Sequence, residues 1–372
     1  NTVAALTTGV VTATITEGDL VTLATLAEAG NAYTITVTDT ASVSSSALTT
    51  LDGKTSVALD ASGVLDVTGS YADVSALYAA GEAGTIMGLG DEAIAVTGGG
   101  VTASEANNIA SKTTGVVTAT VSNTALADYA ALTETGNVYT ISIVDTAIDA
   151  GALRALDAKT TGTITLTGGV QTITGTLSDV NAVLGTAGRK VDAAVVVTDS
   201  INAAEAETLA GETTGIVTAT IDAGAAGTIN TALASDADAT DALTITLTDS
   251  TVAATDLSGL NGKTAVDVNA SSGGTVTGTV AELQAAYTAG VSGLGDEAIT
   301  VTDTTVSVSD VNTVAALTTG VVTAIVDLDT TDVSVTTADI ALSAGSADDR
   351  LSITVDGDVD AAFTATKLDA LL

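Results

Sequence analysis

The chain has 372 residues and a net charge of −36, because 45 acidic side chains are balanced by only 9 Lys and Arg. Such a chain repels nucleic acid and anionic lipid headgroups, since both are bound through clustered basic side chains. Cys and His are absent, which excludes thiolate metal sites and the commonest general base, and the apolar fraction of 46% with no Pro argues against a disordered chain.

Strand-like and helix-like segments alternate from the N-terminus onward. In the segment from Tyr33 to Thr38 every second residue is apolar, which predicts a strand with Tyr33, Ile35 and Val37 facing a core. Leu48 and Leu51 follow at the spacing of one helix face. For the first 111 residues the pattern predicts strands over 9–15, 33–38, 56–60 and 93–97, an extended piece over 64–68, and helices over 18–28, 44–52, 71–80 and 103–111.

These segments predict their own core contacts. We expect Ile35 and Val37 to be buried with Leu48 and Leu51. The equivalent side chains later in the chain are Ile245, Leu247, Leu257 and Leu260.

One stretch returns throughout the chain and sets its organisation. TTGVVTAT at 7–14 recurs at 113–120, as TTGIVTAT at 213–220 and as TTGVVTAI at 318–325. Repetition at a fixed long period is the signature of repeat arrays. We therefore expect one continuous array over 1–372, with super-repeats of approximately 7–112, 113–212 and 213–317 and a partial one over 318–372. Because residue 1 falls within a repeat, we also expect the chain to be part of a longer polypeptide.

Strand–helix alternation usually gives parallel strands, and the connections here are too short for a globular doubly wound sheet. The sequence therefore predicts an α/β solenoid: stacked modules of strand and short helix with a parallel sheet, and a super-repeat of about 105 residues. The alternative is an all-β solenoid in which the helical segments are turns or strands. No apolar run reaches the roughly 18 residues of a membrane-spanning helix, so we expect no membrane insertion.

Aspartates recur where predicted strands end. The expected role is capping of the helix that follows, or closure of the turn, through bonds to backbone amides. The alternative is calcium binding, because hard cations prefer oxygen ligands. The five candidates are Asp39, Asp145, Asp199, Asp249 and Asp303.

The segment GLGDEAI occurs at 88–94 and again at 293–299. Its glycines predict tight turns, since a phosphate-binding loop would need a following Lys and Ser or Thr. We expect the paired acids Asp91-Glu92 and Asp296-Glu297 to be solvated.

The outward Thr residues of the strands permit a second alternative. Ranks of Thr on a regular solenoid can order water, as in ice-binding solenoids. Against this, Asp60, Ala95 and Ser142 interrupt the ranks. The candidate residues are Thr12, Thr14, Thr34, Thr36, Thr38, Thr118, Thr120, Thr163, Thr165 and Thr167.

The stretches TTGVVTATI, YTITVTDT, LDGKT and GLGDEAI, repeated on a period near 105 residues, resemble the tandem repeats of giant secreted surface proteins of cyanobacteria and marine bacteria. Those proteins are typically exported by type I secretion, and many belong to the haemolysin-type adhesins. The resemblance implies an extracellular or cell-surface location and a structural role.

We therefore expect a segment of a surface filament, sheath or surface layer that associates with itself into fibres or a lattice. The alternative is the stalk or ligand-binding face of a secreted adhesin. Divalent cations and surface glycans are further candidate partners. No nucleophile is paired with a base in the sequence, so we expect no enzyme activity and no cofactor.

Overall fold

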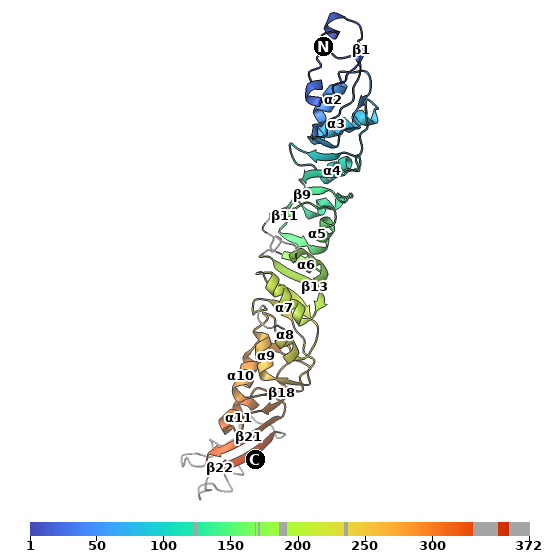
Figure 1. Cartoon of the computed structure of the whole chain (residues 1–372). Coiled ribbons are helices and arrows are strands. Elements are labelled where there is room, and N and C mark those ends of the chain that lie inside the picture. The colour runs from blue at the N-terminus through green and yellow to red at the C-terminus, as the bar shows by residue number, and fades with distance from the viewer. Residues whose placement is uncertain are drawn as a thin grey trace. The chain divides into compact units, whose positions relative to one another are not determined.

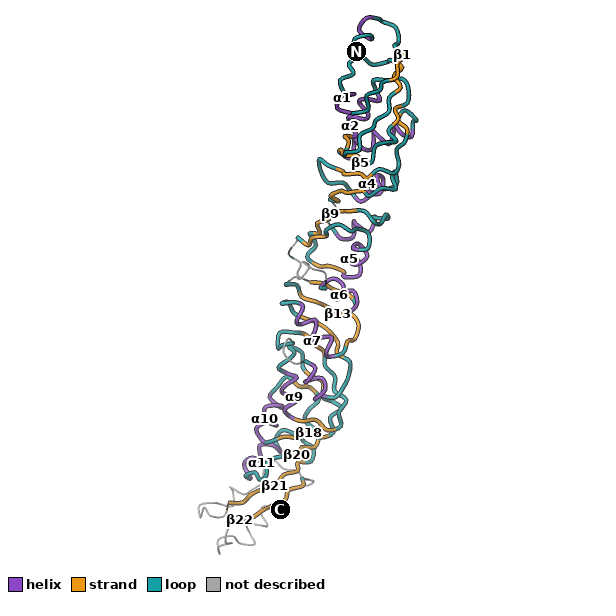
Figure 2. The backbone as a smooth tube through the Cα atoms, in the orientation of Figure 1, coloured by secondary structure: helices purple, strands orange, loops and turns teal. Residues whose placement is uncertain are grey.

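Short strands and short helices alternate along the chain in the computed structural model (Figure 1, Figure 2). The structure describes residues 1–122, 125–167, 169, 172–185, 192–233, 237–329 and 349–356. Their contacts divide into two units, Asn1–Gln171 and Thr172–Leu372, and each unit is treated separately below. We call one strand, or one pair of strands, together with the helix that follows it a module.

Unit 1 contains two 3₁₀ helices and a series of strands and α-helices. Its elements are η1 (Ala4–Leu6), β1 (Thr12–Thr14), α1 (Leu20–Leu23), β2 (Ala32–Thr34), β3 (Val43–Ser44), α2 (Ser45–Asp52), β4 (Leu59–Asp60), β5 (Asp66–Gly69), α3 (Tyr71–Glu82), β6 (Ile86–Met87), β7 (Ala93–Val96), α4 (Ala103–Ala110), β8 (Val117–Val121), η2 (Leu126–Ala131), β9 (Val138–Ile143), β10 (Ala147–Asp149), α5 (Ala150–Asp157) and β11 (Ile164–Leu166).

Unit 2 continues the alternation. Its elements are β12 (Thr172–Gly175), α6 (Leu177–Leu184), β13 (Ala194–Ile201), α7 (Ala203–Glu212), β14 (Val217–Ile221), α8 (Ala226–Ala232), β15 (Ala242–Thr244), β16 (Thr251–Ala253), α9 (Ala254–Asn261), β17 (Val268–Asn269), β18 (Thr275–Gly278), α10 (Val280–Thr288), β19 (Val291–Ser292), β20 (Ala298–Val301), α11 (Val308–Ala315), β21 (Val322–Asp329) and β22 (Arg350–Asp356).

Strands pair in parallel with strands of the neighbouring module. Unit 1 has a six-stranded sheet in the order β11-β9-β8-β7-β5-β3 and two-stranded sheets β1-β2 and β4-β6. In unit 2 the strands β12-β13-β14-β15 lie side by side, as do β16-β18-β20-β21-β22 and β17-β19. The described chain is thus a mixed α/β structure with parallel sheets, as predicted, and the all-β alternative is wrong because helices follow the strands.

The helices begin where a side chain caps them. Thr102 accepts a hydrogen bond from the backbone N–H of Glu105, and the Glu105 carboxylate accepts one from the N–H of Thr102, which is a capping box. Asn202 and Thr279 form the same box with Glu205 and Glu282. These caps satisfy amide donors that have no partner inside the helix, and so they fix where each helix starts.

Several elements are shorter than predicted. The helix expected over 18–28 is only α1, because beyond Thr22 the amides of Thr25 and Leu26 bond three residues back, as in a 3₁₀ turn. The strand expected over 9–15 is β1, and that over 33–38 is β2 followed by an isolated bridge between Thr36 and Asp60. The other predicted elements of the first super-repeat match β4, β5, β7, α2, α3 and α4 to within a few residues.

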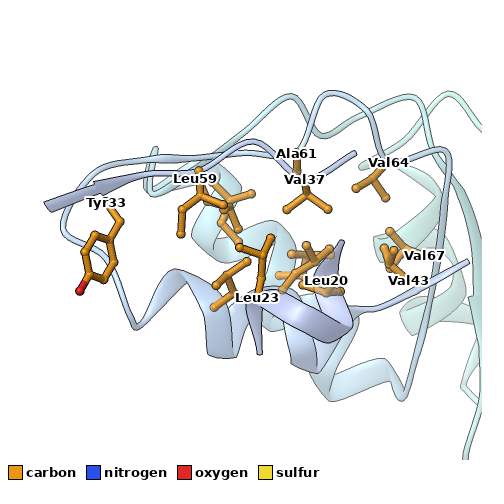
Figure 3. Packing of buried hydrophobic residues seen from close by; sticks show 14 residues of the cluster. Leu20, Leu23, Tyr33, Val37, Val43, Leu59, Ala61, Val64 and Val67 are labelled. Carbon is orange, nitrogen blue, oxygen red and sulfur yellow. The ribbon is translucent and has the colours of Figure 1, made fainter. Parts of the chain in front are cut away.

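The core lies between the strands and the helices of each module. In unit 1, side chains of both elements point toward one another (Figure 3). The predicted contacts are confirmed: Ile35, Val37, Leu48 and Leu51 belong to one buried cluster. Ile245, Leu247, Leu257 and Leu260 are buried as well.

Candidate functional site

The most regular feature of both units is the joint between a module that begins with Thr-Thr-Gly and the module before it. The hydroxyl of Thr113 donates to the Glu92 carbonyl at 2.6 Å and accepts from the N–H of Gly115 at 2.9 Å. One side chain thus links its own turn to the backbone of the neighbouring module. The same pair of bonds joins Thr213 to Ala193 and Gly215, and Thr318 to Glu297 and Gly320.

The glycine of this motif is required by the closeness of the two backbones. A Cβ atom at Gly115 would lie 2.3 Å from the Glu92 carbonyl oxygen, and one at Gly215 would lie 2.2 Å from that of Ala193. Real Cβ atoms do not approach a backbone oxygen this closely, so only Gly fits. We use the name TTG joint for these two features together: the hydrogen bonds of the Thr hydroxyl and the close contact of the Gly with the neighbouring backbone.

A related threonine follows the helices α2, α5 and α9. The hydroxyl of Thr160 accepts from the N–H of Tyr139 at 2.8 Å and from that of Gly162 at 2.9 Å, and Thr160 is 9% exposed. Thr55 and Thr264 make the corresponding bonds to Tyr33 and Leu243. Each of these threonines follows a Lys, and this Lys-Thr pair can be seen to recur in the sequence. Its role could not be predicted, because the sequence does not show which backbone atoms of the neighbouring module lie beside it.

A further joint lies one residue before a strand. The Asn137 side chain accepts from the N–H of Val117 at 2.8 Å, and Asp241 accepts from Val217 at 2.7 Å. Asn31 and Asp349 do the same for Val11 and Val322. Burial raises the pKa of the Asp241 carboxyl above its ordinary value, with the charges of Asp238 and Glu207 acting in the same direction. This joint was not predicted from the sequence, although its polar residue recurs just before a strand.

The five strand-end aspartates cap helices, but not the helices that follow them. The Asp145 carboxylate accepts from the N–H of Leu126, the first residue of η2, at 2.6 Å. That helix belongs to the preceding module, so the prediction of a cap on the following helix is wrong. The bonds are Leu20 to Asp39, Leu126 to Asp145, Leu177 to Asp199, Ala226 to Asp249 and Val280 to Asp303, with distances of 2.6 to 2.8 Å.

These contacts explain why Asp recurs at strand ends. A carboxylate beside the first amide of a helix satisfies an orphan donor and interacts favourably with the positive end of the helix dipole. Each Asp thereby ties two modules together. Within the described residues no group of three or more acidic side chains is arranged to hold a metal ion, and calcium binding by these aspartates stays a prediction to be tested.

The GLGDEAI loops differ from expectation in their glutamates. Glu92 is 1% exposed and Glu297 is 4% exposed, whereas Asp91 and Asp296 are exposed. The prediction that these paired acids are solvated is therefore wrong for the glutamates. One oxygen of Glu92 turns back to accept from the N–H groups of Gly90 and Asp91, which closes the loop.

The ten candidate Thr residues of the ladder are all exposed, as the alternation predicts. Several rows across the strands are interrupted, however, although Thr277, Thr300 and Thr323 form one continuous row in unit 2. In the six-stranded sheet one outward row runs from Thr68 through Ala95 and Thr118 to Val138. In unit 2 a row runs from Thr174 through Val196 and Thr218 to Ala242. The alternation of Thr with apolar side chains does not favour an ice-binding surface.

Comparison with known proteins finds no matching family model, no similar curated protein and no similar solved structure. Across the described residues, no helix combines the length and apolar character needed to cross a membrane. Within the described residues, the recurring feature from which a function can be argued is the set of hydrogen-bonded joints that link one module to the next.

Proposed function

We propose that this chain is a structural segment of an extracellular filament, sheath or surface layer, built as one continuous α/β solenoid across the super-repeats. The observation that carries the proposal is the recurrence of the TTG joint at Thr113, Thr213 and Thr318. A polypeptide whose hydrogen bonds repeatedly link neighbouring modules is suited to load-bearing extension, because each repeat stabilises the next.

The extracellular location is proposed from the resemblance to secreted surface proteins and from the acidic composition. A net charge of −36 with no Cys suits a protein exposed to salt outside the cell, where it must stay soluble without disulfides. We propose that it has no enzyme activity, since its sequence contains no His and pairs no nucleophile with a base. Surface glycans are proposed as partners of its exposed Thr-rich strands, and divalent cations as counterions of its acidic surface without a dedicated site.

We propose that the chain associates with itself into fibres or a lattice, through joints of the kind that link its modules. Thr7 accepts from the N–H of Gly9 at 3.0 Å, as in the other motifs, so the first copy of the motif forms the same local turn as the later ones.

Negative-stain electron microscopy of purified material tests the proposal. Fibres or a lattice are the expected result. Gly115→Ala should shorten or weaken them, because its Cβ would lie 2.3 Å from the Glu92 carbonyl oxygen and would open a joint between two modules. Gly53→Ala is the matched control, since its Cβ would come no nearer than 3.5 Å to any neighbouring atom. Separate flexible rods would contradict the filament and favour the adhesin stalk, and unchanged fibres in Gly115→Ala would contradict a load-bearing role of the TTG joints.

A further inference from the structure

Two pairs of buried polar atoms have no hydrogen-bond partner. They are the hydroxyl of Tyr78 with Oε1 of Glu92 in unit 1, and the hydroxyl of Tyr287 with Oε1 of Glu297 in unit 2. Tyr78 is 6% exposed, so water at the surface does not reach its hydroxyl. Buried polar groups are nearly always hydrogen-bonded, and each exception needs a physical explanation.

The glutamates are held rigidly through their other oxygen. Glu92 Oε2 accepts from the N–H groups of Gly90 at 2.8 Å and Asp91 at 3.1 Å. Glu297 Oε2 accepts from those of Gly295 at 2.7 Å and Asp296 at 3.2 Å. The two carboxyl groups are therefore fixed in the same way in both units, and in both the second oxygen remains without a donor.

In unit 1 Tyr78 lies on α3, which contacts α4, and Glu92 lies directly before β7, the strand that precedes α4. Tyr78 on α3 and Lys112 after α4 line the same small cavity, together with Ser75, whose hydroxyl is also buried without a partner. The residue after Lys112 is Thr113, whose hydroxyl bonds the Glu92 carbonyl at 2.6 Å. Tyr287 on α10 and Glu297 occupy the corresponding positions in unit 2.

The middle super-repeat provides an internal comparison. Counting from the helix N-caps Ser70, Thr176 and Thr279 places Leu184 at the position of Tyr78 and Tyr287. The TTG joint places Ala193 at the position of Glu92 and Glu297, because Thr213 bonds its carbonyl. Leu184 and Ala193 are both buried. The hydroxyl and the carboxyl group occur together in two copies and are replaced together by apolar side chains in the third.

We propose that in each unit the tyrosine hydroxyl and the free glutamate oxygen face one another across a buried binding site for one water molecule. A carboxylate oxygen only accepts and a Tyr hydroxyl can donate, so one water that donates to the glutamate and accepts from the tyrosine satisfies both. Buried waters in proteins typically have two to four polar partners. In unit 1 the Ser75 hydroxyl supplies a third, and this site is independent of the proposed structural role.

A double-mutant cycle in the full chain tests the pair. Tyr78→Leu and Glu92→Ala copy the middle super-repeat, and hydrogen exchange at the amides of Ile94 and Thr114, which bond neighbouring modules, reports local opening. Each single substitution should speed exchange about tenfold, because it leaves the other partner unsatisfied. The double variant should exchange no faster than the worse single variant. Tyr78→Leu with Val21→Ala, at an 81% exposed position on α1, is the control and should be additive, because sites that share no partner do not couple.

A crystal structure at high resolution identifies what occupies the site. We expect one water between the Tyr78 hydroxyl and Glu92 Oε1, and another at Tyr287 and Glu297. If the double variant speeds amide exchange by the product of the two single-variant factors, the two side chains act independently and the pairing is wrong. A direct tyrosine–glutamate hydrogen bond, or a metal ion with several short oxygen contacts, would overturn the water site.

Discussion

At the scale of single residues, each TTG joint depends on a glycine, because a Cβ atom at that position would overlap the backbone of the neighbouring module. Gly115 is the clearest case, because its backbone lies against the Glu92 carbonyl. Gly115→Ala should destabilise the joint by about 1–3 kcal/mol, the usual cost of overpacking. Hydrogen exchange of the Thr114 amide, which bonds the Gly90 carbonyl at 2.8 Å, measures it. Gly53→Ala should change local stability by less than about 0.5 kcal/mol, and an equal loss in both variants would contradict the account.

Asp241 gives the chain a pH dependence at one joint. Because burial raises the pKa of its carboxyl above 3.8, folding favours the protonated form there. This group therefore costs stability at neutral pH. The cost is relieved as the pH falls through the folded-state pKa and is gone once the pH is below 3.8, the unfolded value.

A reciprocal pair of substitutions isolates that effect. Asp241→Asn should abolish the Asp241 contribution, and Asn137→Asp at the equivalent joint should introduce one. Exchange at the Val217 and Val117 amides, corrected for the intrinsic pH dependence of exchange, measures both. The nearby Asp238 carboxyl also titrates, and its pKa is lowered by hydrogen bonds from Thr240. Because Asp238 is present in both the wild type and Asp241→Asn, a comparison of these two proteins isolates the contribution of Asp241. Identical pH profiles for those two proteins would sink the explanation.

At the scale of elements, each helix is stabilised by burial of a narrow face rather than by its own length. Leu257 on α9 is fully buried, and α9 packs against α8 and α10. Leu257→Ala should cost about 2–5 kcal/mol at α9, measured as faster amide exchange along that helix. Val21→Ala, at an 81% exposed position, is the control and should cost less than about 0.5 kcal/mol.

The elements could be predicted from the sequence because their signals are local. Alternation placed Ile35 and Val37 inside, and the spacing of Leu48 and Leu51 gave the helix that covers them. The joints could not be predicted, because their partners are about twenty residues apart and meet only when modules stack. The aspartates show the difference: Asp145 stands out in the sequence, but sequence neighbours suggested the following helix, whereas its spatial neighbour is the first residue of η2. Likewise a glutamate in a Gly-rich turn gives no local sign that its side chain points inward.

At the scale of the whole molecule, the large negative charge should make stability depend on salt in general rather than on calcium. Exposed charges are screened over about 8–10 Å at physiological ionic strength. The strand-end aspartates are already bonded to helix amides. We expect the melting temperature to rise with sodium chloride, and to stay unchanged when calcium is added and then chelated at constant ionic strength. A shift of many degrees on chelation would identify Asp39, Asp145, Asp199, Asp249 and Asp303 as ligands.

The central claim is that stability passes from each module to its neighbours through the joints. Site-resolved hydrogen exchange of Leu257→Ala across the described chain tests it most directly. We expect faster exchange in α9, a smaller increase in α8 and α10, and no change at distant amides such as that of Ile94, because modules in an array contact only their neighbours. A uniform increase in exchange along the entire chain would contradict the claim.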